Sequence, residues 1–211
     1  MSSLCLLGVD TGGTFTDFVA VDGSGIRLHK CLSTPDQPER AILQGIRALG
    51  LEDRIQDGSL TVVHGSTVAT NALLEGKGAR TALVTTLGFE DVLEIGRQAR
   101  TELYNLDIDR APALAPWELR FGLAERVDHT GAIIEDLTPD ALETLTTLLQ
   151  DAEVDAVAVS FLFSFLNPAH EEMVLNAIQH LPNSPFISIS SRVLPEFREY
   201  ERTSTVVVNS Y

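Results

Sequence analysis

The order of apolar and polar positions predicts that the chain begins with short strands. Leu4–Val9 is an almost unbroken apolar run that ends in Asp10, a pattern typical of a strand buried on both faces of a sheet. Phe15–Val21 is a second run, and the turn residues after it lead to a third run, Ile26–Leu32. The chain is therefore expected to start as a meander of three strands.

Helical spacing appears after the meander. Pro38 suits a first helical turn, Ile42, Ile46 and Leu49 recur at helical intervals, and Gly50 ends the helix. A strand, a helix and a strand are then expected at Leu60–His64, Thr67–Glu75 and Ala79–Thr85. This order predicts an α/β lobe and matches the ribonuclease-H-like fold of the actin-like ATPase superfamily, although order alone says little about function.

A change of pattern predicts an additional α/β subdomain. The stretch Gly96–Phe121 shows little periodicity. After it we expect a hairpin at Glu125–Glu135, strands at Val154–Ser160 and Phe186–Ser190, and helices at Pro139–Gln150, capped by Thr138, and at Asn167–His180. The two strands and the helix between them predict a parallel pair. We therefore divide the chain into a ribonuclease-H-like phosphate-binding lobe (residues 1–95), an α/β subdomain (96–195) and the start of a segment that leads into a further domain (196–211).

Composition and charge narrow the classes of function. A hydrophobic content of 44% supports a buried core, and a formal net charge of −15 argues against nucleic acid and anionic membranes as partners. No apolar stretch approaches the roughly 20 residues that a membrane-spanning helix needs. Cys5 and Cys31 could pair if their strands are neighbours, but such sparse use of cysteine favours reduced thiols and a cytoplasmic location.

The sharpest candidate site lies between the first two predicted strands. Gly12 and Gly13 permit unusual backbone dihedrals and a close approach of ligand, and successive amides in such a turn suit an anion. The residues predicted to bind phosphate are Thr11, Gly12, Gly13, Thr14 and Thr16. Asp10 is a candidate catalytic residue that can hold a magnesium ion through water. A plain hairpin is the alternative, but the aspartate and the three threonines favour a phosphate site.

A second candidate segment, HGSTVATN at residues 64–71, joins a predicted strand to a helix. The first amides of that helix and its dipole favour an anion or a developing oxyanion. His64 is a candidate catalytic residue, although a histidine at a strand end is more often structural. The residues predicted to bind substrate or an anion are Gly65, Ser66, Thr67 and Asn71. Ordinary capping of the helix by Ser66 or Thr67 is the alternative.

Two further groups of charged residues follow. Arg97 and Arg100 lie in the irregular stretch and could bind a carboxylate or phosphate of a substrate, each through two hydrogen bonds. Simple solvation at the surface explains them equally well. Near the end of the chain, residues 198–202 alternate in the sign of their charge, which is typical of a solvated helix face.

With these motifs in hand, the sequence resembles the hydantoinase A, 5-oxoprolinase and acetone or acetophenone carboxylase family. The matching segments are DTGGTFTD at 10–17, HGSTVATNALLEGKGARTALVTTLGFEDVLEIGRQ at 64–98 and REYERTSTVVVNSY at 198–211. The resemblance implies an actin-like ATPase fold in which the turn after Asp10 contacts the phosphates of ATP, together with Mg²⁺. It also implies an ATP-dependent hydrolase that opens a cyclic amide, such as hydantoin, N-methylhydantoin or 5-oxoproline, by phosphorylating the carbonyl oxygen.

The resemblance leaves other functions open. One alternative is a subunit of an ATP-dependent acetone- or acetophenone-type carboxylase, which acts on a ketone. An alternative of another class is an actin-like nucleotide-binding interaction module, which substrate-stimulated ATP consumption would exclude. Family members are longer, so the resemblance implies a missing carboxy-terminal domain and a partner subunit of the hydantoinase B type. We expect negligible turnover by these 211 residues alone, because half a nucleotide cleft cannot exclude water or orient the transferred phosphoryl group.

Overall fold

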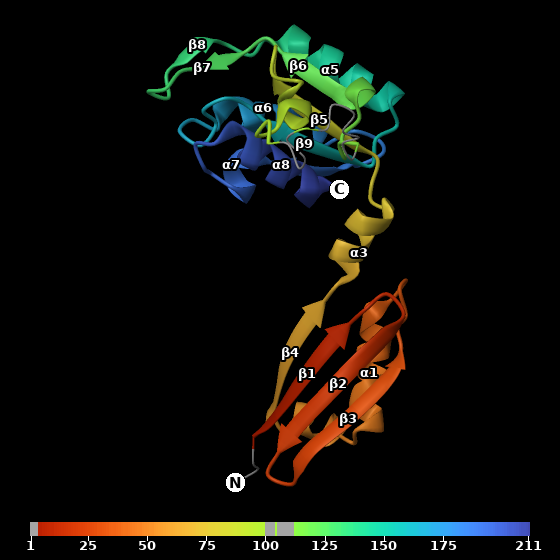
Figure 1. Ribbon diagram of the computed structural model, residues 1–211. Helices are drawn as coiled ribbons and strands as arrows, with labels where there is room; N and C mark the ends of the chain where they lie inside the picture. Colours follow the sequence, from red (N-terminus) through yellow and green to blue (C-terminus); the bar gives the residue numbers. More distant parts are fainter. Residues whose placement is uncertain (1–3, 100–103, 105–111) are drawn as a thin grey trace. The chain divides into compact units, whose positions relative to one another are not determined.

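The computed structural model describes residues 4–99, 104 and 112–211 of the protein and shows a mixed α/β architecture (Figure 1). The chain forms two compact units, Met1–Gly78 (unit 1) and Ala79–Tyr211 (unit 2). This division differs from the one at residues 95 and 96 that the sequence suggested. The reason is that the strand after Gly78 pairs only with strands from later in the chain.

Unit 1 is a four-stranded sheet of order β3-β2-β1-β4. The strands β1 (Cys5–Thr11), β2 (Phe15–Asp22) and β3 (Gly25–Leu32) form the predicted antiparallel meander, and β4 (Leu60–Ser66) runs parallel to β1. Helix α1 (Pro38–Ala48) begins with proline in its first turn, as predicted. Two shorter helices, α2 (Glu52–Gln56) and α3 (Val68–Glu75), precede and follow β4.

The core of unit 1 lies between α1 and one face of the sheet. Leu7 of β1 and Phe18 of β2 are fully buried there, together with Ile46 of α1. Gly45 allows this packing, because a Cβ at that position would lie 2.1 Å from the Phe18 ring.

The prediction that β1 is buried on both faces is wrong for this chain. Its residues alternate between buried and accessible, and Leu6 is 44% exposed, since α1 covers only one face of the sheet.

Unit 2 is built around a parallel sheet of order β10-β9-β5-β6, formed by β5 (Thr81–Thr86), β6 (Arg120–Leu123), β9 (Ala156–Ser160) and β10 (Phe186–Ile189). The pairing of β9 with β10 confirms the predicted strand-helix-strand unit. Every residue of β5 and β9 is buried, as expected for strands covered on both faces.

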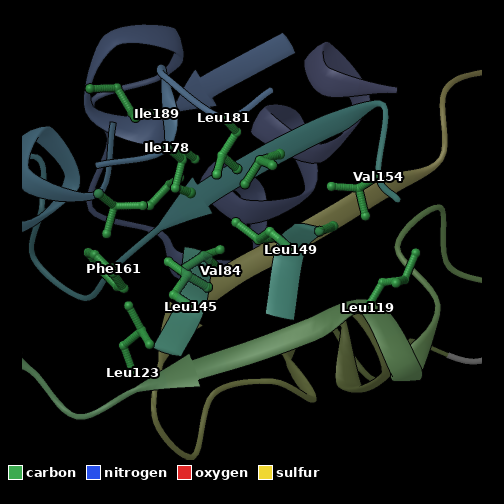
Figure 2. Packing of buried hydrophobic residues seen from close by; sticks show 14 of the residues in the cluster. Val84, Leu119, Leu123, Leu145, Leu149, Val154, Phe161, Ile178, Leu181 and Ile189 are labelled. Carbon is green, nitrogen blue, oxygen red and sulfur yellow. The ribbon is translucent and has the colours of Figure 1, made fainter. Parts of the chain in front are cut away.

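Helices cover the two faces of this sheet. On one face, side chains of α5 (Pro139–Asp151) and α6 (Ala169–Ile178) pack on β5 and β9. In Figure 2, Leu145 and Leu149 lie near Val84, and Ile178 belongs to the same cluster. On the other face, Val206 and Val207 of α8 (Glu199–Ser210) pack on β5 and β9. Among the helices of the described residues, none has the length and apolar character needed to cross a membrane.

The remaining elements of unit 2 are short. The predicted hairpin is confirmed as β7 (Arg126–Val127) and β8 (Ile133–Glu135), and Thr138 caps α5 as expected. The other short elements are α4 (Val92–Ile95), a 3₁₀ turn at Trp117–Leu119 and α7 (Ser190–Val193).

The carboxy-terminal segment of unit 2 departs from one prediction. Residues 199–210 form a helix. The helix face is not simply solvated, because Arg202 is almost fully buried.

Candidate functional site

The turn between β1 and β2 presents two free backbone donors. Gly12 pairs with Phe15, its amide donating to the Phe15 carbonyl oxygen at 2.9 Å, so Gly13 and Thr14 form the tip. The amides of these two tip residues have no hydrogen-bond acceptor among the described residues. Both residues are exposed to solvent. The tip can therefore donate two hydrogen bonds to an anion.

The two glycines of the turn act through their small size. Neither is among the glycines with a positive φ, so the expectation of an unusual backbone conformation at Gly12 and Gly13 is not met. A Cβ at Gly12 would lie 3.1 Å from the Phe15 carbonyl oxygen, and a Cβ at Gly13 would lie 3.3 Å from the side-chain nitrogen Nδ2 of Asn71. Glycine is therefore needed because strand and helix atoms approach closely.

Ser33, which the sequence analysis missed, holds the turn from the end of β3. Its hydroxyl donates to the Gly12 carbonyl oxygen at 2.7 Å and lies 2.9 Å from the Thr16 hydroxyl oxygen, while its amide donates to the Thr14 carbonyl oxygen at 2.9 Å. Thr16 is fully buried, so its predicted contact with phosphate gives way to this supporting role. Only the pairing of β2 with β3 reveals the contact, because Ser33 lies outside the motif.

A pocket of about 500 Å³ opens beside the turn. Its walls come from the turn, from the connection between β3 and α1, and from α3 with the residues just after it. The lining side chains and backbone belong to Thr11, Gly12, Gly13, Thr14, Ser33, Thr34, Pro35, Pro38, Val68, Asn71, Ala72, Glu75 and Lys77. Four of the five predicted phosphate ligands and Asn71 thus line one cavity within unit 1.

Asp10 lies on the other face of the sheet. It is exposed, its neighbours in register are Asp17 on β2 and Gly65 on β4, and its carboxylate lies over Gly65. Lys30 is 3.0 Å from the Asp17 carboxylate, whereas Asp10 has no ion-pair partner in the described part of the chain. Within that part, no group of three or more histidine, cysteine or acidic residues could hold a metal. Asp10 is therefore an accessible carboxylate without a cation beside it.

The His64 side chain lies on the opposite face of the sheet from the Asp10 carboxylate. The His64 ring nitrogen Nε2 is 2.9 Å from the Thr11 hydroxyl oxygen, and both side chains are on the α1 face. The structure therefore does not bring the two candidate catalytic residues together.

At the start of α3, Ser66 makes a local hydrogen bond. The Ser66 hydroxyl accepts a hydrogen bond from the Val68 amide at 3.3 Å, and Thr67 occupies the N-cap position without a side-chain hydrogen bond. This arrangement favours the capping interpretation for Ser66.

The arginine pair is only partly described. Arg97 lies in unit 2, where its guanidinium forms an ion pair with Glu201 at 2.5 Å. Arg100 lies outside the described residues. An arginine that is already paired with a carboxylate is a weaker candidate for binding a substrate anion.

A buried polar network in unit 2 also escaped the sequence analysis. Glu171 accepts hydrogen bonds from the Phe161 amide, the Ser190 hydroxyl and the Ser191 amide, at 3.1, 2.6 and 2.9 Å. Burial lowers the pKa of the Arg202 guanidinium, and the charge of Glu171 opposes that shift.

A second buried group in unit 2 joins Glu125 and His170. The Glu125 carboxylate is 2.7 Å from His170 Nδ1 and also accepts from the Thr86 hydroxyl. The carboxylates of Glu125 and Glu171 both have hydrogen-bond partners inside the fold, which indicates a structural role for the two networks.

Comparisons with known proteins agree with these motifs. A family model described as the hydantoinase/oxoprolinase N-terminal region matches residues 6–181. Caprolactamase subunit alpha from Pseudomonas jessenii is 37% identical over 97% of this chain and 31% of its own length. The structure of ATP-dependent caprolactamase from the same organism superposes with a TM-score of 0.80 and 34% identity, over 98% of this chain and 31% of that one.

A second solved structure is similar over the whole chain. Nucleotide-free acetone carboxylase, from work on ATP-dependent acetone carboxylation, superposes with a TM-score of 0.86 and 26% identity, over 99% of this chain and 32% of that one. The chain thus spans about a third of the length of the relatives that it matches.

Proposed function

The chain belongs to the hydantoinase/oxoprolinase family, whose amino-terminal region it matches, and on this premise we propose that it is the phosphate-binding part of an ATP-dependent enzyme that opens a cyclic amide. The observation that carries the proposal is the turn between β1 and β2, where two free amides border a pocket. An enzyme that binds a nucleoside triphosphate requires a preformed anion cradle of this kind.

The residues of unit 1 fit ATP and Mg²⁺ in chemical terms. The Gly13 and Thr14 amides would donate hydrogen bonds to phosphate oxygens, and Ser33 would keep the turn in place. The accessible Asp10 carboxylate, which has no cation beside it in the described part of the chain, would hold Mg²⁺ through water. Bound ATP would supply the phosphoryl group that makes an amide carbonyl a better electrophile.

We assign unit 1 to the ribonuclease-H-like fold of the actin-like ATPase superfamily. The sheet order β3-β2-β1-β4, with β1, β2 and β3 antiparallel and β4 parallel to β1, supports this assignment. So does the position of the candidate phosphate turn, which joins the two central strands at their ends.

The similarity to caprolactamase favours an amide substrate, whereas the similarity to acetone carboxylase favours a ketone. We expect the longer polypeptide, with a partner subunit of the hydantoinase B type, to release phosphate faster when hydantoin, N-methylhydantoin or 5-oxoproline is added. Bicarbonate with acetone or acetophenone is the matched comparison. Phosphate release stimulated only by a ketone would replace the hydrolase with the carboxylase, and no stimulation by any of these compounds would contradict both.

Replacing Ser33 with alanine should weaken ATP binding by about five- to tenfold. The variant loses a hydrogen bond that holds the Gly12 carbonyl, which is worth roughly 1 kcal/mol, and the turn amides lose their fixed direction. Calorimetric titration of the longer polypeptide with ATP and Mg²⁺ measures the effect.

Two control variants make the Ser33 result specific. Ser33→Thr keeps the hydroxyl and should restore binding. Ser24→Ala removes a hydroxyl from the turn between β2 and β3, where Ser24 contacts only Asp22, and should leave ATP affinity unchanged. An equal loss of melting temperature in Ser33→Ala and Ser24→Ala, with normal ATP affinity in both, would assign Ser33 a purely structural role.

A further inference from the structure

The face of the unit 1 sheet opposite α1 carries a continuous apolar surface. Strand pairing places Val21 between Leu6 and Ile26, and Val19 between Gly8 and Leu28, in two adjacent rows across three strands. Val63 of β4 continues the second row. We call this surface the open face and define it by Leu6, Val19, Val21, Ile26, Leu28 and Val63.

The side chains of the open face are accessible to an unusual degree. Leu28 is 74% exposed and Ile26 is 70% exposed, whereas Phe18 on the opposite face of the same sheet is 1% exposed. Figure 1 shows α1 against one face of the unit 1 sheet and no helix against the other, within the continuously described residues 4–78. A contiguous apolar surface of this kind marks an interface, because soluble proteins seldom leave one in water.

The outer edge of β4 adds to the exposed area. This strand pairs with β1 and ends the sheet, and nearly all of its residues are accessible. A strand that runs parallel to its neighbour normally lies inside a layered structure, and an unprotected edge invites pairing with other chains. Both features indicate that unit 1 is an incomplete layer.

We propose that the open face is an internal interface, covered by a part of the longer family polypeptide that these 211 residues do not include. Three observations support this occupant. The relatives are about three times as long as the matched region, so enough polypeptide exists. The run Leu4–Val9 has the pattern of a strand buried on both faces, although the chain buries only one. The two rows, followed across all four strands, contain no charged residue, since β4 contributes Thr61 and Val63 to them, and this suits an apolar layer.

A second copy of the chain is a poorer occupant. Each chain carries a net charge of −15, so association through an apolar face would bring two strongly negative molecules together.

The edge of the open face has a further consequence for the covering segment. The next row of the same face contains Asp10, Asp17 and Lys30, and the exposed Phe15 and Leu32 lie beyond it, so a layer that covers the apolar rows borders the Asp10 carboxylate.

Thiol labelling of Leu28→Cys in the longer polypeptide tests the proposal. Maleimide modification of the tryptic peptide that contains residue 28, measured by mass spectrometry, should be at least tenfold slower than in urea. Leu43→Cys on α1 is the matched control, because Leu43 is a 48% exposed leucine of unit 1 outside the open face and should react quickly. Ile26→Cys provides a second position should Leu28→Cys fold poorly.

The same variant in the 211-residue chain identifies the occupant. In the 211-residue chain we expect maleimide to modify Leu28→Cys as fast as Leu43→Cys. Equally fast reaction in the longer polypeptide would overturn the proposal. So would protection that is already present in the 211 residues, since unit 2 would then be the cover, and so would protection that disappears on dilution together with a dimer seen by light scattering.

Discussion

Replacing Asp10 with asparagine should lower substrate-dependent phosphate release by about 100-fold or more. The side chain keeps its size but loses the charge that would hold Mg²⁺ at the phosphate turn, and such electrostatic contacts are strongest in the transition state. Stability should change by less than about 0.5 kcal/mol, because Asp10 is exposed and faces the like charge of Asp17 across the strands. Phosphate release and thermal melting of the longer polypeptide with its partner subunit measure the two effects.

Asp53→Asn is the control for Asp10→Asn. Asp53 is another exposed carboxylate of unit 1, at the start of α2 and away from the turn, so its loss should leave both activity and stability close to wild type. A rate for Asp10→Asn within twofold of the wild-type rate would remove Asp10 from the mechanism. A large fall in melting temperature would make it a structural residue instead.

Replacing Glu171 with alanine should lower the free energy of unfolding of unit 2 by about 3–5 kcal/mol. Glu171 is fully buried and accepts three hydrogen bonds, so its loss leaves the Phe161 and Ser191 amides without that partner. The buried Arg202 guanidinium would lose the largest of the charge interactions that oppose the lowering of its pKa by burial. Trp117, the single tryptophan of the chain, reports unfolding of unit 2 by fluorescence during a urea titration.

The neighbouring residue Glu172 is the matched control. It is also on α6, but its ion pair with Arg192 is largely exposed, and such pairs contribute no more than about 1 kcal/mol. Glu172→Ala should therefore unfold at almost the same urea concentration as the wild type. If Glu171→Ala and Glu172→Ala had equal midpoints, the buried network would have no special role in stability.

Local sequence patterns predicted the elements well because their signals are local. The meander, the capped start of α5 and the parallel pair of β9 and β10 each follow from alternation, helical spacing or a cap within a few residues. The membership of β5 could not be predicted in the same way. Its run of buried residues suits either sheet, and only pairing with residues about 75 positions later decides between them.

The candidate site was predicted in its residues but not in its arrangement. The motif identified the turn, and four of the predicted phosphate ligands line one pocket. The period of two along β1 places Asp10 and Thr11 on opposite faces, a simple consequence of strand geometry that the grouping of Asp10 with His64 overlooked. The support from Ser33 depends on a contact across 21 residues and the burial of Arg202 on one across 41 residues, and the sequence carries no local signal for either.

The sheets of the two units also differ in when they can form. The candidate phosphate turn and its support from Ser33 involve residues 11–33 alone, so its contacts close short loops. In unit 2, the hydroxyl of Thr85 donates to the Ser160 carbonyl oxygen across 75 residues, and β5 cannot join β9 until that later strand exists. Closing long loops slows folding. We therefore expect the turn between β1 and β2 to form on the nascent chain before β5 pairs with β9.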